Sequence, residues 1–179
     1  QYGPAAGLAQ LRNWLAEWQG VKPEQILTGN GSLELVQFLC TAMIKPGDVV
    51  FTESPSYDRA INLFRRNGAN VIGVPLQADG PDMDALEALL AQHKPKLFYV
   101  IPDFQNPSGA TCSTAKRKRL VELAEQRAQY GLLLERDFDP GAALLIAAGH
   151  LAAMRIGTES ARPITAGCVF MRSIPERIP

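Results

Sequence analysis

The chain has 179 residues, of which 46% are hydrophobic and 20% charged, a composition typical of one globular domain with a hydrophobic core. Its 18 basic and 18 acidic residues cancel, so no overall field draws the chain to nucleic acid or to an anionic membrane. No apolar run approaches the ~20 residues of a membrane helix, and residues 1–4 lack the charged start and apolar stretch of a signal peptide. We therefore expect a cytoplasmic protein without a membrane partner.

The three cysteines, Cys40, Cys112 and Cys168, are widely spaced and have no histidine nearby. Their odd number and their spacing favour reduced thiols over a disulfide framework or a zinc centre. His93 and His150 are isolated as well. We therefore predict no metal site.

The predicted elements alternate between short β-branched runs and longer segments of helical period. In chain order they are helices over residues 8–18 and 33–43, a strand over 49–52, a helix over 56–66, a strand over 70–75, a helix over 83–92, a strand over 96–101, a helix over 113–129 and a strand over 131–135. This alternation is typical of strand-helix-strand units on a parallel sheet. It predicts an α/β fold, a three-layer sandwich with a mostly parallel central sheet, as a single domain over residues 1–179.

Three further segments are less regular or can be interpreted in two ways. Residues 141–153 are rich in alanine and leucine without a polar face or a strand signal, whereas residues 168–171 are compatible with one more strand. Trp14 and Trp18 lie at helical spacing and are expected in the core. The basic run at residues 116–119 falls within a helix, where consecutive side chains point in different directions, so we expect a solvated face and no nucleic-acid partner.

Ligands of open parallel sheets sit beyond the carboxyl ends of the strands, and four such loops carry unusual residues. Residues 28–32 (TGNGS) precede a helix, whose first N–H groups can either be capped locally or bind a phosphate. In residues 53–57 (ESPSY), Tyr57 can lie against a flat heterocycle or pack on the sheet edge. Both alternatives stay open for each loop.

The third and fourth loops are polar segments directly after apolar strands. Residues 102–109 (PDFQNPSG) hold Asn106 between prolines, which can aim a rigid amide at a ligand oxygen. Residues 135–139 (ERDFD) are rich in charge. Charged side chains at the end of a buried strand are costly unless they form ion pairs or belong to a functional site. The two loops therefore favour a ligand site over plain turns.

In this order, the four segments resemble class I/II pyridoxal 5′-phosphate (PLP)-dependent aminotransferases of fold type I. Residues 102–109 look like the family's P-x-x-Q-N-P-T/S-G element, in the version used by aminoadipate-aminotransferase-like proteins and by the aminotransferase-like domains of MocR-type regulators. Residues 2–12 are similar to the family's Y-x-x-x-x-G-x-x-x-L-R stretch, and residues 45–50 to the turn before the next strand. The resemblance implies part of the large, PLP-binding domain, with the small carboxyl-terminal domain absent.

Carried over residue by residue, the resemblance implies a cofactor site. Asn30, Gly31 and Ser32 would hold the phosphate of PLP, Tyr57 would stack on its pyridine ring, and Asn106 would hydrogen-bond its phenolic oxygen. These roles agree with a phosphate cradle, an aromatic face and a fixed amide in the same loops.

Two departures from the family pattern concern its chemistry. In an ungapped alignment Arg136 replaces the aspartate that pairs with the pyridine nitrogen, and Asp137 can take that role only if the strand shifts by one residue, which reverses its face. Glu176 stands nearest to the position of the lysine that forms the Schiff base, and a carboxylate cannot form an imine. No catalytic residue is therefore assigned, and the chain is expected to be inactive as given.

Three hypotheses follow. The leading one is an aminotransferase domain fragment whose ancestral reaction moved an amino group between an amino acid and a 2-oxo acid. The second is the effector-binding domain of a MocR/GntR-type transcriptional regulator, and the third is a fold-only protein that binds something other than PLP. The resemblance also implies a homodimer and a small-molecule amino acid or 2-oxo acid partner.

Overall fold

The computed structural model describes residues 3–19, 22–126, 131–139, 142–148 and 167–172, with side chains for residues 3–18 and 22–124. The helices are α1 (Ala9–Gln19), α2 (Ser32–Met43), α3 (Asp58–Arg66), α4 (Met83–Gln92), α5 (Thr114–Gln126) and the short 3-10 helix η1 (Pro23–Gln25). The strands are β1 (Ile26–Gly29), β2 (Val49–Ser54), β3 (Asn70–Gln77), β4 (Gly80–Pro81), β5 (Leu97–Val100), β6 (Gly131–Asp139), β7 (Ala142–Ala148) and β8 (Gly167–Arg172).

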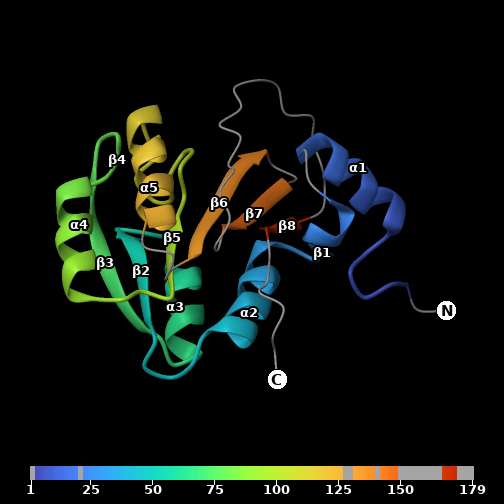
Figure 1. Cartoon of the computed structure of the whole chain (residues 1–179), viewed down its shortest axis with the longest axis horizontal. Coiled ribbons are helices and arrows are strands. Elements are labelled where there is room, and N and C mark those ends of the chain that lie inside the picture. The colour runs from blue at the N-terminus through green and yellow to red at the C-terminus, as the bar shows by residue number, and fades with distance from the viewer. Residues whose placement is uncertain (1–2, 20–21, 127–130, 140–141, 149–166, 173–179) are drawn as a thin grey trace.

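The strands form a single mixed sheet in the order β1-β8-β7-β6-β5-β2-β3-β4 (Figure 1). Four pairings are parallel, namely β2 with β3, β2 with β5, β5 with β6 and β7 with β8. The pairings of β1 with β8, β6 with β7 and β3 with β4 are antiparallel. The α/β class is confirmed, with a more mixed sheet than the strand-helix alternation suggests.

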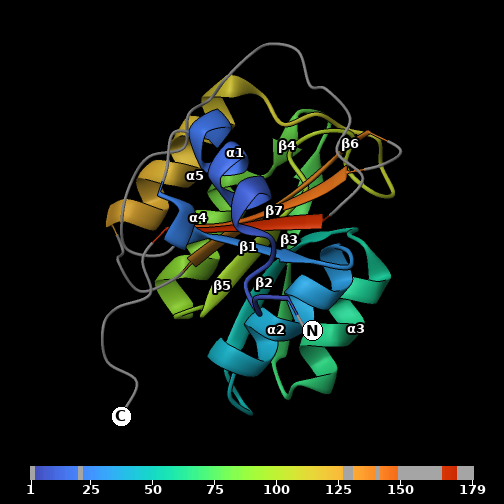
Figure 2. The same ribbon diagram turned by 90° about the vertical axis from the view of Figure 1, so that its right-hand side faces the viewer.

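Helices cover both faces of the sheet, as Figure 2 shows. On one face α2 and α3 contribute Leu35, Val36 and Phe64 to a core cluster that includes Val50 and Tyr99 of the strands. On the other face, α4 and α5 contribute Leu86, Leu90, Leu120 and Leu123 to a cluster around Phe51, Phe98 and Val100. Since successive strand residues face opposite sides, each buried strand feeds both clusters.

Local chemistry sets the ends of the helices. Asp82 precedes α4 and its Oδ1 accepts the Ala85 N–H at 3.0 Å, which satisfies one of the unpaired donors of the first turn. Ser113 precedes α5, and its Oγ accepts the Lys116 N–H at 3.4 Å. The predicted helix over residues 83–92 is confirmed at both ends, and α5 begins one residue after the predicted start.

The predicted strands over residues 49–52, 70–75, 96–101, 131–135 and 168–171 are confirmed, with small shifts at their ends. Sequence patterns missed β1, β4 and β7. Strand β7 lies between β6 and β8, and its uniform run of alanine and leucine carries no alternation to identify it.

The prediction that Trp14 and Trp18 lie in the core is wrong. Their rings stack on each other with centroids 5.7 Å apart, and the two residues are 48% and 47% exposed. Helix α1 instead buries Leu15 and Ala16. Helical spacing identifies a stripe, but only the packing of α1 decides which stripe is covered.

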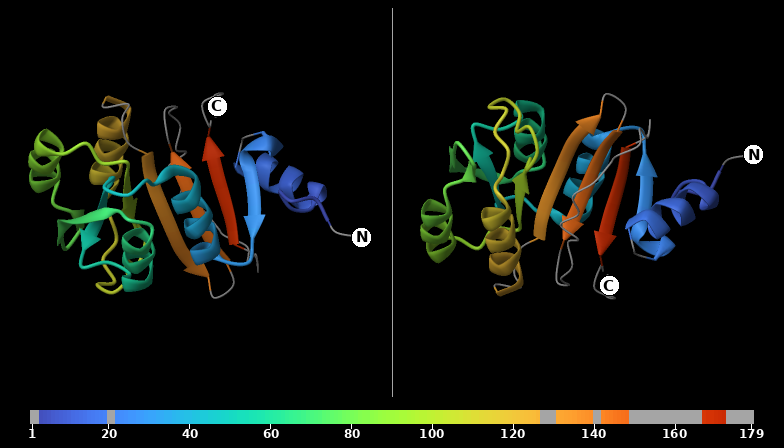
Figure 3. Two further views of the ribbon diagram at one scale, coloured as in Figure 1. Left: turned by 90° about the horizontal axis from the view of Figure 1, so that it is seen from below. Right: turned by 90° about the horizontal axis from the view of Figure 1, so that it is seen from above.

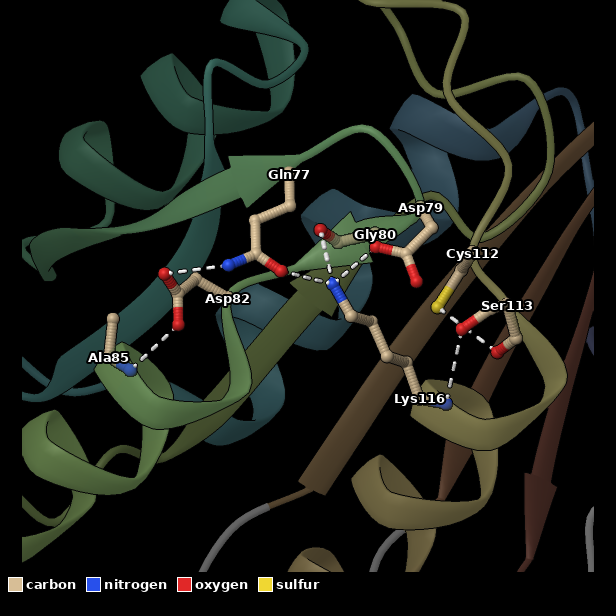
Figure 4. Close-up of polar contacts among 8 residues, drawn as sticks. All are labelled: Gln77, Asp79, Gly80, Asp82, Ala85, Cys112, Ser113 and Lys116. Atoms are coloured by element: carbon tan, nitrogen blue, oxygen red, sulfur yellow. Dashed lines mark hydrogen bonds and ion pairs between the residues drawn. The ribbon is translucent and has the colours of Figure 1, made fainter.

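The basic run on α5 is divided among carboxylates. Lys116 pairs with Asp79 at 2.6 Å, Arg117 with Asp103 at 2.6 Å, and Arg119 with Glu87 at 2.7 Å. The Lys116 ammonium also reaches Gln77 Oε1 and ties the β3–β4 hairpin to α5 (Figure 4), and its hydrogen bond holds the pKa of Asp79 below its usual range. The basic run therefore connects α5 to the β3–β4 hairpin, to the loop that holds Asp103 and to α4.

Cys40 and Cys112 are buried free thiols, in agreement with the predicted reduced state. Cys168 lies in β8, whose side chains are outside the described set. Within the described part of the chain, no helix combines the length and the apolar character needed to cross a membrane.

Candidate functional site

The candidate loops share one edge of the sheet because the strands that precede them run in the same direction. Strands β2, β5 and β6 are mutually parallel. Strand β1 is antiparallel to β8, which is parallel to β7, which is antiparallel to β6, so β1 also runs with β6. Figure 3 shows β1 and β6 pointing the same way and β8 the opposite way. The segments that follow β1, β2 and β5 therefore lie beyond the same, carboxyl-terminal edge. The prediction of a fourth loop at residues 135–139 is wrong, because these residues continue β6 to its end at that edge and pair with β7.

The first loop has the backbone of an anion cradle. Gly31 is the N-cap of α2 with φ of 134°, a left-handed value that favours glycine, and it provides no side chain to cap the helix. A Cβ placed on Gly31 would meet nothing within 4 Å. The first turn of α2, beginning at Ser32, thus faces open space, and the positive end of a helix dipole favours an anion there.

A carboxylate of the chain already occupies part of this cradle. The Asn30 N–H donates to Glu34 Oε2 at 2.6 Å, and a Cβ placed on Gly29 would come within 3.0 Å of the same oxygen. Glu34 thus acts as an internal anion in the first turn of α2. The cradle fits a phosphate in its backbone and its open space, but Glu34 opposes the binding of a second anion.

The second loop places Tyr57 immediately before α3, as the N-cap residue of that helix. Tyr57 is partly buried and packs against the core cluster on the α2 and α3 face. Its ring therefore has a hydrophobic support on one side. This placement combines the two alternatives left open by the sequence, because a ring that packs on the sheet edge can still offer its other side to a ligand.

The third loop is rigidly braced and presents Asn106 at the surface. Asn106 is exposed, whereas its neighbour Gln105 is 2% exposed. Gln105 Oε1 accepts the Ser108 N–H at 3.0 Å and the Ser108 hydroxyl at 2.6 Å, and the Cys112 N–H donates to the Pro102 carbonyl at 2.8 Å. These bonds fix the backbone on both sides of Asn106.

An ion pair fastens the same loop to α5. The Arg117 Nη2 donates to Asp103 Oδ1 at 2.6 Å and to the Pro102 carbonyl at 2.8 Å, while its Nε donates to the Cys112 carbonyl at 2.7 Å. Both side chains are largely buried, at 16% and 13% exposure. Sequence reasoning missed this contact, since nothing in the pattern of charges matches Asp103 with one particular arginine.

Glu53, at the end of β2, is a buried carboxyl that the sequence did not single out. It is 1% exposed, and its Oε2 accepts the Ile101 N–H at 3.0 Å. Burial raises the pKa of Glu53 to about 7, against the opposing effect of hydrogen bonds from Ile101 and Gln105. A charged residue within an otherwise apolar strand was the signal available in the sequence.

Residues 135–139 belong to strand β6 and are described by their backbone. Leu133 and Leu134 of β6 pair with Tyr99 and Val100 of β5, so position 133 shares the face of Tyr99 and position 134 that of Val100. By alternation, position 137 falls on the face that carries α2, and position 136 on the face of α4 and α5. In the backbone register, positions 136 and 137 therefore belong to opposite faces of β6.

Five of the chain's six lysines lie away from this edge or are already paired. Lys22 precedes β1, Lys45 precedes β2, and Lys94 and Lys96 precede β5, so these four lie toward the amino-terminal ends of the strands. On α5, Lys116 pairs with Asp79, and Lys118 is exposed. Glu176, the residue predicted nearest to the family lysine, lies outside the described residues.

Comparisons with known proteins agree with this geometry. The family model described as aminotransferase class I and II matches residues 1–134. The 2-aminoadipate transaminase of Thermus thermophilus is 40% identical over 137 residues, which are 76% of this chain and 34% of that protein. An uncharacterized HTH-type transcriptional regulator of Bacillus subtilis, YisV, is 30% identical over 130 residues, covering 70% of this chain and 27% of the regulator.

Among solved structures, the α-aminoadipate aminotransferase LysN of Thermus thermophilus, complexed with N-(5′-phosphopyridoxyl)-L-leucine, superposes with a TM-score of 0.70. It is 39% identical and covers 76% of this chain and 34% of its own. The chain thus spans about a third of the length of the relatives it matches. With three quarters of its residues in the family match and a sheet that superposes on a family structure, this chain belongs to the class I and II aminotransferases, a PLP-dependent family.

Proposed function

We propose that this chain is the cofactor-binding part of a PLP-dependent aminotransferase that moves an amino group between an amino acid and a 2-oxo acid. The observation that carries the proposal is the common direction of β1, β2, β5 and β6, which brings the loops after β1, β2 and β5 and the end of β6 to one edge. The similarity to 2-aminoadipate transaminase favours an amino acid with an acidic side chain as the substrate class.

Each candidate residue has a role that its surroundings support. The N–H groups around Asn30, Gly31 and Ser32 would hold the phosphate, and Tyr57 would support one face of the ring. Asn106 would donate to the phenolic oxygen, and Asp137 would keep the ring nitrogen protonated. When bound, PLP supplies a ring that accepts the electrons released at the α-carbon of the substrate.

We further infer that residues 1–179 bind PLP reversibly and do not attach it covalently. A Schiff base needs an uncharged lysine amine beside the cofactor. Four of the chain's lysines lie toward the other edge of the sheet, and Lys116 is held by Asp79 and Gln77. The protein is expected to be a cytoplasmic homodimer, and exposed apolar side chains such as Trp14, Trp18 and Phe38 offer an interface.

PLP titration followed by borohydride reduction tests this function. We expect saturable binding, detected by the absorbance of PLP, that weakens at least about tenfold in Asn106→Ala, since that change removes the hydrogen bond to the phenolic oxygen and leaves that oxygen without its donor. Mass spectrometry after reduction should show no added pyridoxyl group. Absence of saturable binding would overturn the cofactor proposal. A covalent adduct would overturn the inference that no lysine of this chain attaches PLP.

A second candidate function, effector binding within a transcriptional regulator, is favoured by the match to YisV over 70% of this chain. A winged-helix segment encoded upstream of Gln1 and in frame with it would support this function. An in-frame downstream continuation with a lysine-containing segment would support the enzyme. Sequencing the DNA on both sides of the coding region distinguishes the two.

The internal carboxylate of Glu34 leads to a prediction about the phosphate cradle. We expect Glu34→Gln to bind PLP roughly tenfold more tightly, because like charges a few ångström apart near a protein surface repel by about 1–2 kcal/mol or more. Glutamine keeps an oxygen that can accept the Asn30 N–H, so the loop itself is preserved. Titration with PLP and with pyridoxal, which lacks the phosphate, measures the effect. An equal gain for both ligands would show that the charge of Glu34 does not act on the phosphate.

A further inference from the structure

A buried polar network links the two loops that carry Tyr57 and Asn106. Glu53 lies at its base, 1% exposed, on the β2 position that pairs with Val74 and therefore faces α4 and α5. Its Oε2 accepts the N–H of Ile101, the residue that follows β5. Burying a carboxyl is costly, so a fold that keeps one here needs the hydrogen bonds it makes.

Gln105 is the second member of this network and is 2% exposed. Its side-chain amide favours the charged form of the Glu53 carboxyl, which lowers the pKa of that carboxyl against the effect of burial, and its Nε2 donates to the Pro55 carbonyl at 2.8 Å. Its Oε1 accepts two bonds from Ser108, at 3.0 and 2.6 Å. One amide thus joins the end of β2, the segment before Tyr57 and the turn that contains Asn106.

We propose that Glu53 is a positioning residue that acts through Gln105 to set the Asn106 loop relative to the Tyr57 segment, and that its protonation state controls how firmly the loop is held. The proposal rests on the proposed function insofar as these loops hold the cofactor ring. Glu53 itself contacts no ring atom, since it lies beneath the loop.

The direction in which Glu53 affects the loop follows from the hydrogen bonds that each of its protonation states can make. An ionised carboxylate only accepts hydrogen bonds, so it can receive both the Ile101 N–H and a Gln105 N–H. In a protonated carboxyl, one of the two oxygens carries the proton and acts as a donor. Burial raises the pKa of Glu53 to about 7. The loop is therefore held more firmly above pH 7 than below it.

Other titratable groups pack around Glu53 from the loop, the β3–β4 hairpin, α5 and the α4 side. Burial raises the pKa of the Cys112 thiol to about 11, so it stays protonated. The Asp103–Arg117 and Asp79–Lys116 pairs on the loop, the β3–β4 hairpin and α5 are internally compensated. On the α4 side, His93 lies edge-on to Phe51, two residues earlier in β2.

The same titration affects the stability of the fold with a defined sign. Between the ordinary carboxyl value of 4.5 and about 7, the folded chain keeps a proton on Glu53 that the unfolded chain has lost. The free energy of unfolding should therefore fall as the pH rises through this interval, and Glu53→Gln should remove that part of the slope.

The experiment compares PLP affinity between wild type and Glu53→Gln at pH 5.5 and pH 8.5. Glutamine resembles the protonated carboxyl, so the two proteins should bind equally at pH 5.5 and differ roughly five- to tenfold at pH 8.5. Titration of PLP itself is common to both and cancels in the ratio. Glu24→Gln, at an exposed glutamate, and His93→Gln should leave the ratio to wild type unchanged with pH. A ratio for Glu53→Gln that does not change with pH overturns the proposal.

A measurement without ligand separates this inference from the proposed function. The side-chain amide signals of Gln105 and Asn106, followed by ¹⁵N NMR, should move with a midpoint near pH 7 in wild type and stay fixed in Glu53→Gln. Gln105→Met should bind PLP weakly at both pH values, because it removes the link and keeps Glu53. If no variant binds PLP, the proposed function fails and the amide titration alone decides: signals that do not titrate in wild type overturn the inference.

Discussion

Arg117→Met should lower the free energy of unfolding by roughly 3 kcal/mol and weaken PLP binding, because it leaves the Asp103 carboxylate in a largely buried setting without its cation. The same change removes the hydrogen bonds that the guanidinium donates to the Pro102 and Cys112 carbonyls. Those carbonyls stand at the two ends of the loop that carries Asn106. Urea unfolding and PLP titration of the variant measure both effects.

A matched control for Arg117 lies two residues further along α5. Arg119 makes an ion pair of similar length with Glu87, but the two side chains are 37% and 44% exposed. Water and salt screen such a pair, so Arg119→Met should change stability much less and leave PLP binding unchanged. Equal losses for the two variants would mean that the Arg117 pair has no special role in holding the loop. Asp103→Asn should restore part of the stability lost in Arg117→Met, since it removes the uncompensated charge.

Phe64→Ala should cost about 3–5 kcal/mol, the usual range for removing a fully buried phenylalanine. Phe64 is 0% exposed on α3, and its ring meets that of Tyr99 edge to face with centroids 5.6 Å apart. The change leaves a cavity between the sheet and α3, the helix that begins after Tyr57. Urea unfolding monitored by circular dichroism gives the loss.

Phe38→Ala provides the comparison for Phe64, because Phe38 is 50% exposed on α2 and its removal opens no core cavity. Its expected cost is below about 1 kcal/mol. Phe64→Leu should recover much of the lost stability by refilling most of the volume. A loss in Phe64→Ala as small as that in Phe38→Ala would contradict the packing on this face of the sheet.

Elements with strong local signals could be predicted from the sequence. The periodicity of residues 83–92 predicted α4 at both ends, and the β-branched runs predicted β2, β3 and β5. The three loops that the strand directions bring to one edge were also recognisable from their residues, whereas residues 135–139, predicted as a fourth loop, are part of β6. These features depend on neighbouring residues, and neighbours are what a sequence displays directly.

The meeting of distant residues could be learned only from the folded chain. Packing turned Trp14 and Trp18 outward, paired Arg117 with Asp103, and put Glu34 inside the cradle beside Asn30. The pairing of β6 with β5 placed positions 136 and 137 on opposite faces of β6. Burial and pairing depend on which surfaces come together across the sheet, and a carboxyl such as Glu53 acquires its unusual pKa only when those surfaces remove it from water.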